Sequence, residues 1–185
     1  MKQALLIIDS QQDLIDGSNG EKGVFAKEKL IQNINLVIEK AVHNQIPIIC
    51  IRDVDVSGGE GPGFQLHKGI KVPSEVVLFD KAATNSFYGT PLNAYLQHKG
   101  IEHLVIMGCQ TEYCIDTAVR TATINQFDVT LIADGHSTCD SPILTAEQII
   151  HHHNHILHGH YNVDHFSLVR DAAEDVFVPT HHIYR

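Results

Sequence analysis

One cysteine lies where a helix is expected to leave the end of a buried strand. The apolar run at residues 104–107 predicts the strand, and residues 108–122, rich in small and branched side chains, predict a turn and a helix. Cys114 then falls in the first turn of that helix, where unpaired N–H groups and the helix dipole favour thiolate over thiol. The position predicts a reactive cysteine; the alternative is a buried, inert one.

Two charged residues follow other predicted strands in the same way. Asp9 ends the run that starts at Ala4, and Lys81 follows the run that starts at Val76. A thiol that attacks an unreactive carbonyl needs a proton acceptor, a stabilising cation and an oxyanion site. Asp9 could accept the proton if an apolar pocket raises its pKa, Lys81 could hold the charges together, and the backbone N–H of Cys114 could bind the oxyanion. The joint placement predicts a catalytic set, although alone each would suggest a turn residue or a solvated charge.

The rest of the pattern predicts the elements that position these residues. Apolar runs predict strands at residues 4–9, 47–51, 76–80, 104–107, 129–132 and 166–169. Helices are predicted at residues 27–44, from Thr90-Pro91 to Gly100, after Cys114, and from Ser141-Pro142. Short apolar strands that alternate with helices predict a three-layer α/β/α fold with a doubly wound, six-stranded parallel sheet. Ligands of such sheets bind at the carboxyl ends of the strands.

Size and composition restrict the class of protein. We expect residues 1–185 to form a single domain, and the net charge of −9 argues against a nucleic-acid binder. No apolar run approaches the roughly 20 residues that span a bilayer, and no signal peptide is visible, so we expect neither membrane binding nor export. Four cysteines without a C-x-x-C pair predict no zinc site and a reduced, cytoplasmic protein.

Four segments in order resemble a known family. They are residues 6–14, residues 80–81 with 86–90, residues 108–122 and, more weakly, residues 133–138. Together they resemble the isochorismatase-like cysteine hydrolases, which include nicotinamidases and other small amidases. The resemblance implies the strand order 3-2-1-4-5-6 and a homo-oligomer, either a dimer or a tetramer. It also implies a second oxyanion donor, the N–H of Gln110, exposed by a cis peptide after Cys109.

The predicted function is hydrolysis of a C–N bond in a small amide-type substrate through a thioester. Asp9 would take the thiol proton of Cys114, return it to the departing amine, and then activate water. One alternative is an isochorismatase that cleaves a vinyl ether, but family members with that activity do not use the cysteine. A second is a non-catalytic phospho-receiver, which Lys81 after the third strand argues against. No G-x-G-x-x-G segment follows a strand, so no dinucleotide or flavin is expected.

Metal binding is a further possibility at two segments. Some resembled amidases carry a metal on Asp-x-His, but here residues 53–55 read Asp-Val-Asp, with His67 downstream. We predict no metal cofactor, while Asp53, Asp55 and His67 stay an open alternative. In the histidine cluster at residues 151–155, helical periodicity places His153 on the apolar face. It places His151, His155 and His158 on the opposite face, which we expect to be solvated or in contact with another subunit, so the cluster is not the predicted active site.

Aromatic and polar residues near the catalytic segments are the predicted substrate pocket, with core packing as the alternative for Phe87 and Ile115. These residues are Gln11, Phe64, His67, Phe87, Tyr88, Tyr113 and Ile115. Asp13 and Asp80 are predicted to be structural.

Overall fold

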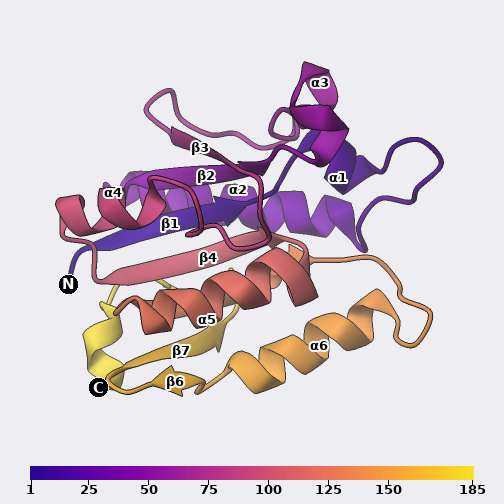
Figure 1. Ribbon diagram of the computed structural model, residues 1–185. Coiled ribbons are helices and arrows are strands. Elements are labelled where there is room, and N and C mark those ends of the chain that lie inside the picture. The colour runs from indigo at the N-terminus through magenta and orange to yellow at the C-terminus, as the bar shows by residue number, and fades with distance from the viewer.

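A parallel sheet with helices on both faces forms the centre of the computed structural model, which describes residues 1–185 (Figure 1). The strand order is β3-β2-β1-β4-β5-β7-β6, and only β6 runs antiparallel to its neighbour. The strands are β1 Gln3–Ile8, β2 Ile48–Asp53, β3 Val77–Lys81, β4 His103–Cys109, β5 Asp128–Ser137, β6 Tyr161–Asn162 and β7 His165–Arg170. The predicted α/β class and strand order are confirmed. The predicted count of six strands is one short, because the polar two-residue β6 carries no apolar run.

The four predicted helices are present, but two of them begin later than predicted, and two short helices were not predicted. The helices are α1 Gln12–Asp16, α2 Lys27–His43, α3 Gly61–Phe64, α4 Leu92–Lys99, α5 Asp116–Ile124 and α6 Ala146–Leu157; α1 and α3 are the two that were not predicted. The prediction that Ser141-Pro142 begins a helix is wrong. Thr145 caps α6 through a reciprocal capping box with Gln148, whereas the Ser141 hydroxyl accepts backbone N–H bonds that close the preceding turn. No helix has both the length and the apolar character needed to cross a membrane.

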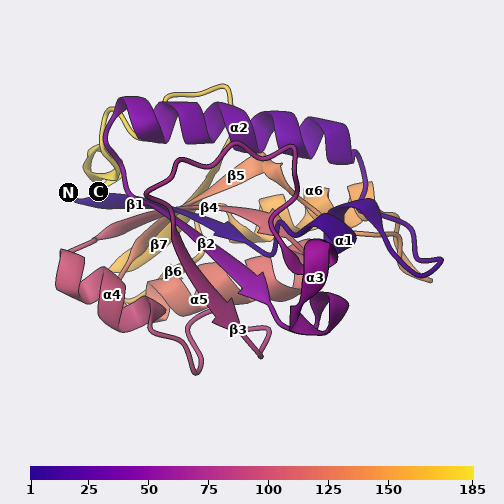
Figure 2. The same cartoon turned by 90° about the horizontal axis from the view of Figure 1, so that it is seen from above.

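Strand β1 is buried on both faces, which explains its continuous apolar sequence. Successive side chains point to opposite layers, so Leu5 and Ile7 pack in the cluster formed with α2. Leu6 and Ile8 pack in the other cluster, formed with α4 and α5. Figure 2 shows α2 on one side of the sheet and α4 and α5 on the other. Strand β1 therefore ends in the middle of the sheet edge, between β2 and β4, where the topology switches direction.

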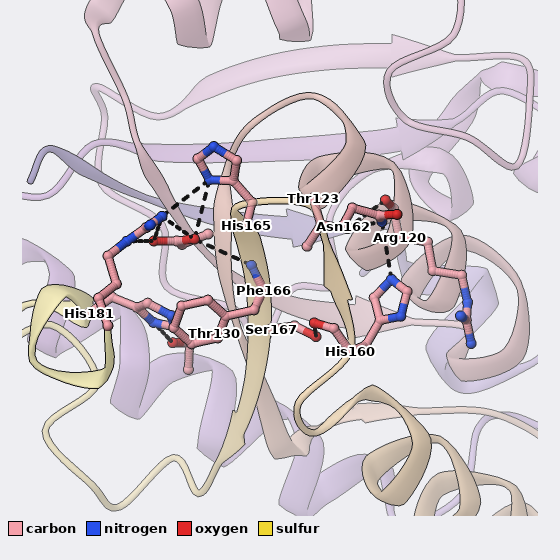
Figure 3. Close-up of polar contacts among 11 residues, drawn as sticks. Arg120, Thr123, Thr130, His160, Asn162, His165, Phe166, Ser167 and His181 are labelled. Atoms are coloured by element: carbon pink, nitrogen blue, oxygen red, sulfur yellow. Dashed lines mark hydrogen bonds and ion pairs between the residues drawn. The ribbon is translucent and has the colours of Figure 1, made fainter.

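A buried ion pair holds the last residues of the chain against the opposite edge of the sheet. Asp128, at the start of β5, is fully buried, and Arg185 donates to its two oxygens at 2.9 and 2.8 Å. His165 and the backbone N–H of Phe166 contact the same carboxylate at 3.3 and 3.4 Å (Figure 3). This network lies at the amino ends of β5 and β7, far from the edge where β1 ends.

We expect Arg185→Ala to lower the free energy of unfolding by about 2 kcal/mol, because the buried Asp128 carboxylate loses its bidentate partner. The loss stays below the full cost of a broken buried pair because the Arg185 side chain is 35% exposed. Urea unfolding measures the change. Arg120→Ala, which breaks the surface pair with Asp116, is the control and should cost less than about 1 kcal/mol. Equal losses in the two variants would contradict the anchoring role.

Candidate active site

Three strand ends bring Asp9, Lys81 and Cys114 together. Asp9 follows β1, Lys81 is the last residue of β3, and Cys114 lies in the π-helical turn η2 (Thr111–Ile115) that follows β4. The Lys81 ammonium lies 2.9 Å from Asp9 Oδ2 and 3.4 Å from Cys114 Sγ. It also forms an ion pair with Asp53, the last residue of the intervening strand β2. One buried cation therefore contacts all three of the other groups.

A close approach of two strands fixes the position of Asp9. Ile8 of β1 pairs with Gly108 of β4, and a Cβ atom at Gly108 would lie 2.0 Å from the Ile8 carbonyl oxygen. Gly108 also has a φ of +125°, in the region that favours glycine. Asp9 itself turns the chain with a φ of 47°, and its N–H donates to Ile51 at 2.9 Å. Residue 108 is thus confined to glycine by the route of the catalytic strand.

The segment between β4 and α5 differs from the predicted helix start. Cys114 lies in a five-residue π-helical turn, and α5 begins only at Asp116. The peptide bond between Cys109 and Gln110 is cis, as the resemblance implied. Gln110 and Cys114 line the same cleft as Asp9. The two predicted oxyanion donors therefore belong to residues that border one cavity.

Burial controls the protonation of the site. It raises the pKa of Asp9 to about 6, although the Lys81 charge opposes it. Burial, followed by the negative charge of Asp9, raises the pKa of the Cys114 thiol to about 12. For Lys81, burial acts to lower the pKa, but the neighbouring Asp9 and Asp53 carboxylates outweigh it and the pKa rises. At neutral pH the site holds a thiol, a carboxylate and an ammonium. This differs from the thiolate expected at a helix N-terminus, because desolvation and the Asp9 carboxylate outweigh the Lys81 ammonium.

Gln11 has a different place from the one predicted. Its side chain is fully buried and brackets the end of β2: it accepts from the Asp53 N–H at 2.8 Å and donates to the Asp53 carbonyl at 3.0 Å. It also donates to the Phe64 carbonyl at 2.9 Å. Gln11 therefore positions Asp53 and the α3 turn and does not line the cleft.

The other predicted pocket residues also lie outside the cleft. Phe64 is buried beneath the Arg52 guanidinium, and Phe87 stacks on Phe127. Ile115 is in the core, whereas Tyr88 and Tyr113 point into solvent. Tyr113 and Ile115 flank Cys114 in the sequence, but successive side chains along the η2 turn face different directions. For Phe87 and Ile115, the structure agrees with the alternative of core packing.

The walls of the cleft come instead from α1 with the loop after it and from the turn after β2. The cavity has a volume of about 770 Å³. Apart from Asp9, Asp53, Gln110 and Cys114, its lining residues are Asp13, Leu14, Ser18, Asn19, Glu21, Asp55, Val56, Ser57 and Gly58. The length and irregularity of the loop after β2 were the only sequence signal for this wall. Asp13, predicted to be structural, lines the cleft, whereas Asp80 does form a structural pair with Arg52.

The residues present do not fit the metal site of the resembled amidases. His67 faces Asp16 at 3.5 Å and accepts the Gly69 N–H, so it does not join Asp53 and Asp55. Ligand atoms of Asp9, Asp53 and Cys114 do lie within 4.8 Å of one another, but all three already contact the Lys81 ammonium.

The histidine cluster on α6 does not contribute to this cleft. The His153 ring is half-buried and hydrogen-bonds to the Ile149 carbonyl at 2.9 Å, as expected for a packed histidine. His151, His155 and His158 are exposed, as the periodicity predicted.

Known proteins match this chain along most of its length. The family model of the isochorismatase domain matches residues 3–148. YddQ of Bacillus subtilis, an uncharacterized isochorismatase family protein, is 26% identical over 87% of this chain and 94% of its own length. A probable inactive nicotinamidase of Arabidopsis thaliana is 30% identical over 77% of this chain and 84% of its own length.

An enzyme and a crystal structure extend the comparison. Streptothricin hydrolase of Streptomyces noursei is 24% identical over 76% of this chain but only 56% of that enzyme. The crystal structure of an isochorismatase family protein has a TM-score of 0.81 at 28% identity, covering 90% of this chain and 96% of the other.

Replacing the buried cation should change the titration of Asp9. In Lys81→Met we expect the pKa of Asp9 to rise above its wild-type value of about 6, because the charge that opposes burial is removed. ¹³C NMR of the labelled carboxyl carbon, assigned with Asp9→Asn, gives the midpoint. Arg52→Met removes a cation that pairs with Asp80 and should leave the midpoint unchanged. The same midpoint in wild type and Lys81→Met would contradict the electrostatic role of Lys81.

Proposed function

This chain belongs to the isochorismatase family of hydrolases, and from that premise we propose that it hydrolyses a C–N bond of a small amide-type compound through a thioester on Cys114. The observation that carries the proposal is the contact of one buried ammonium, that of Lys81, with both Asp9 and Cys114. Nucleophile, base and cation are the three components that acyl transfer to sulfur requires.

The protonation of the cleft supports a general-base step. The Asp9 carboxylate takes the thiol proton as Cys114 Sγ attacks the amide carbon, so the thiolate forms only during the reaction. The N–H groups of Gln110 and Cys114 stabilise the oxyanion. Asp9 then gives the proton to the departing amine, and the C–N bond breaks. Water, deprotonated by Asp9, hydrolyses the thioester, and the sulfur recovers its proton. Lys81 keeps its proton throughout, because its pKa is raised.

The alternatives have less support. Vinyl ether hydrolysis leaves the contact between Lys81 and Cys114 without a role. The phospho-receiver interpretation does not agree with membership of a hydrolase family.

We expect Cys114→Ala and Asp9→Asn to reduce turnover by about three orders of magnitude or more, because each removes a component that acts as a unit with the others. Ammonia release is measured across small amides, ureides and carbamoyl compounds, and circular dichroism verifies the fold. Cys139→Ala, at a half-buried cysteine outside the proposed catalytic set, is the matched control and should retain activity. Wild-type rates in Cys114→Ala would rule out the thioester.

The rate should depend on pH through Asp9. The carboxylate must be ionised to accept the thiol proton, and its pKa is about 6. We therefore expect kcat/KM to be constant above this value and to fall about tenfold per pH unit below it. The measurement uses a substrate that does not ionise between pH 4 and 9. A rate that stays constant down to pH 4 would exclude Asp9 as the base.

A further inference from the structure

All the charged side chains that line the cleft are acidic. Asp9, Asp13, Glu21, Asp53 and Asp55 line it, and no lysine, arginine or histidine does. The Lys81 ammonium is buried, does not line the cleft, and forms ion pairs with Asp9 and Asp53. Asp13, Glu21 and Asp55 have no ion-pair partner anywhere in the 185 residues. Three of the five carboxylates that line the cleft therefore have no cation to neutralise them.

Asp13 is the one of these three that the structure holds in place. The Ser57 hydroxyl donates to its Oδ2, which links α1 to the turn after β2. On its other side lies Gly63 of α3, where a Cβ atom would meet the same oxygen at 2.0 Å. The second oxygen, Oδ1, forms no hydrogen bond within the protein. A half-buried carboxylate that is fixed through one oxygen and free at the other is preorganised to accept a donor from a ligand.

A second observation at the floor also points to a ligand. Asp9 is 1% exposed and lines the cavity, yet its Oδ1 has no hydrogen-bond partner. A carboxylate oxygen accepts more than one hydrogen bond, so Oδ1, on the group that accepts the Cys114 thiol proton, is also open to a donor from a bound molecule. The amide nitrogen of a substrate is such a donor. The floor and the wall thus both present free carboxylate oxygens to the same cavity.

We propose that the cleft selects substrates that carry a cationic group, an ammonium or a guanidinium, beside the scissile amide, and that Asp13 is the anchor of that cation. This rests on the proposed function, because it assigns the substrate class of the same site. When Cys114 attacks, Asp9 takes the thiol proton and the negative charge passes to the oxyanion, so the cleft keeps four other carboxylates and an unchanged net charge. An anionic substrate is therefore repelled both on entry and during attack, whereas a cationic one is attracted.

Three charge-matched reagents test this without knowledge of the substrate. They are the 2-aminoethyl, 2-hydroxyethyl and 2-sulfonatoethyl methanethiosulfonates, which are cationic, neutral and anionic. Each converts a thiol to a mixed disulfide, releasing methanesulfinate and the thiol proton. The rate at Cys114 is followed by peptide mass spectrometry, with Cys114→Ala as the blank, and divided by the rate with free 2-mercaptoethanol. We expect the normalised cation-to-anion ratio to exceed about 100 at low salt and to fall at 0.5 M NaCl.

Variants then locate the selectivity. Asp13→Asn should lower the ratio about tenfold, and Asp55→Asn, at an exposed carboxylate, should lower it by a smaller factor. Glu39→Gln removes the same charge from an exposed site on α2 and should leave the ratio unchanged. A ratio near one in the wild type, or a faster anionic reagent, would overturn the cationic substrate class and leave the proposed hydrolase intact. If Asp13→Asn does not change the ratio, Asp13 is not the residue that binds the cation. If Cys114 reacts with none of the reagents, both proposals fail.

Discussion

The buried ammonium of Lys81 is the interaction on which the rest of the site depends. Two carboxylates and a thiol lie at the ends of three neighbouring strands, β1, β2 and β4, where burial of an unpaired charge would cost several kcal/mol. A single cation in contact with Asp9, Asp53 and Cys114 makes this arrangement stable. Without it, the pKa of Asp9 would rise further above its usual value, and the carboxyl would be ionised to a smaller extent at neutral pH. The cation thus favours the ionised Asp9 that the proposed mechanism needs.

The strand order explains how one lysine reaches these groups. Lys81 ends β3 at one side of the sheet, Asp53 ends β2 in register with it, and Asp9 follows β1 one strand further. A lysine side chain is long enough to cross the end of the intervening strand, and a shorter cationic side chain at residue 81 would not reach Asp9. Gln11 fixes Asp53 through its backbone groups, so the β2 end stays beside the ammonium. The geometry of the site is therefore a property of the sheet edge and not of a flexible loop.

The sequence predicted the positions of those site residues that follow the ends of strands. Asp9, Lys81 and Cys114 follow continuous apolar runs, and parallel strands place such residues at one edge whatever the loops do. The walls were not predictable, because Asp13 lies in a five-residue helix without an apolar period, and Glu21 and Asp55 lie in irregular segments whose path depends on long-range contacts. The same limit explains the displaced aromatic residues: Phe87 and Tyr113 are near the catalytic segments in sequence, but local backbone direction turns one into the core and the other into solvent. Protonation was also beyond the sequence, since the pKa of Cys114 depends on how deeply the folded chain buries it.

The raised pKa of Cys114 gives the charge of the cleft a second consequence. In the free protein the thiol is held neutral by burial and by the Asp9 carboxylate, so the sulfur is a weak nucleophile when no ligand is bound. A ligand cation bound at Asp13 would add positive charge to the cavity and offset the carboxylates that oppose thiolate formation. Its presence lowers the energy of the thiolate and of the oxyanion relative to the resting state. The binding of a cationic substrate and the activation of the sulfur would then be a single electrostatic event, which an anionic ligand of equal size could not bring about.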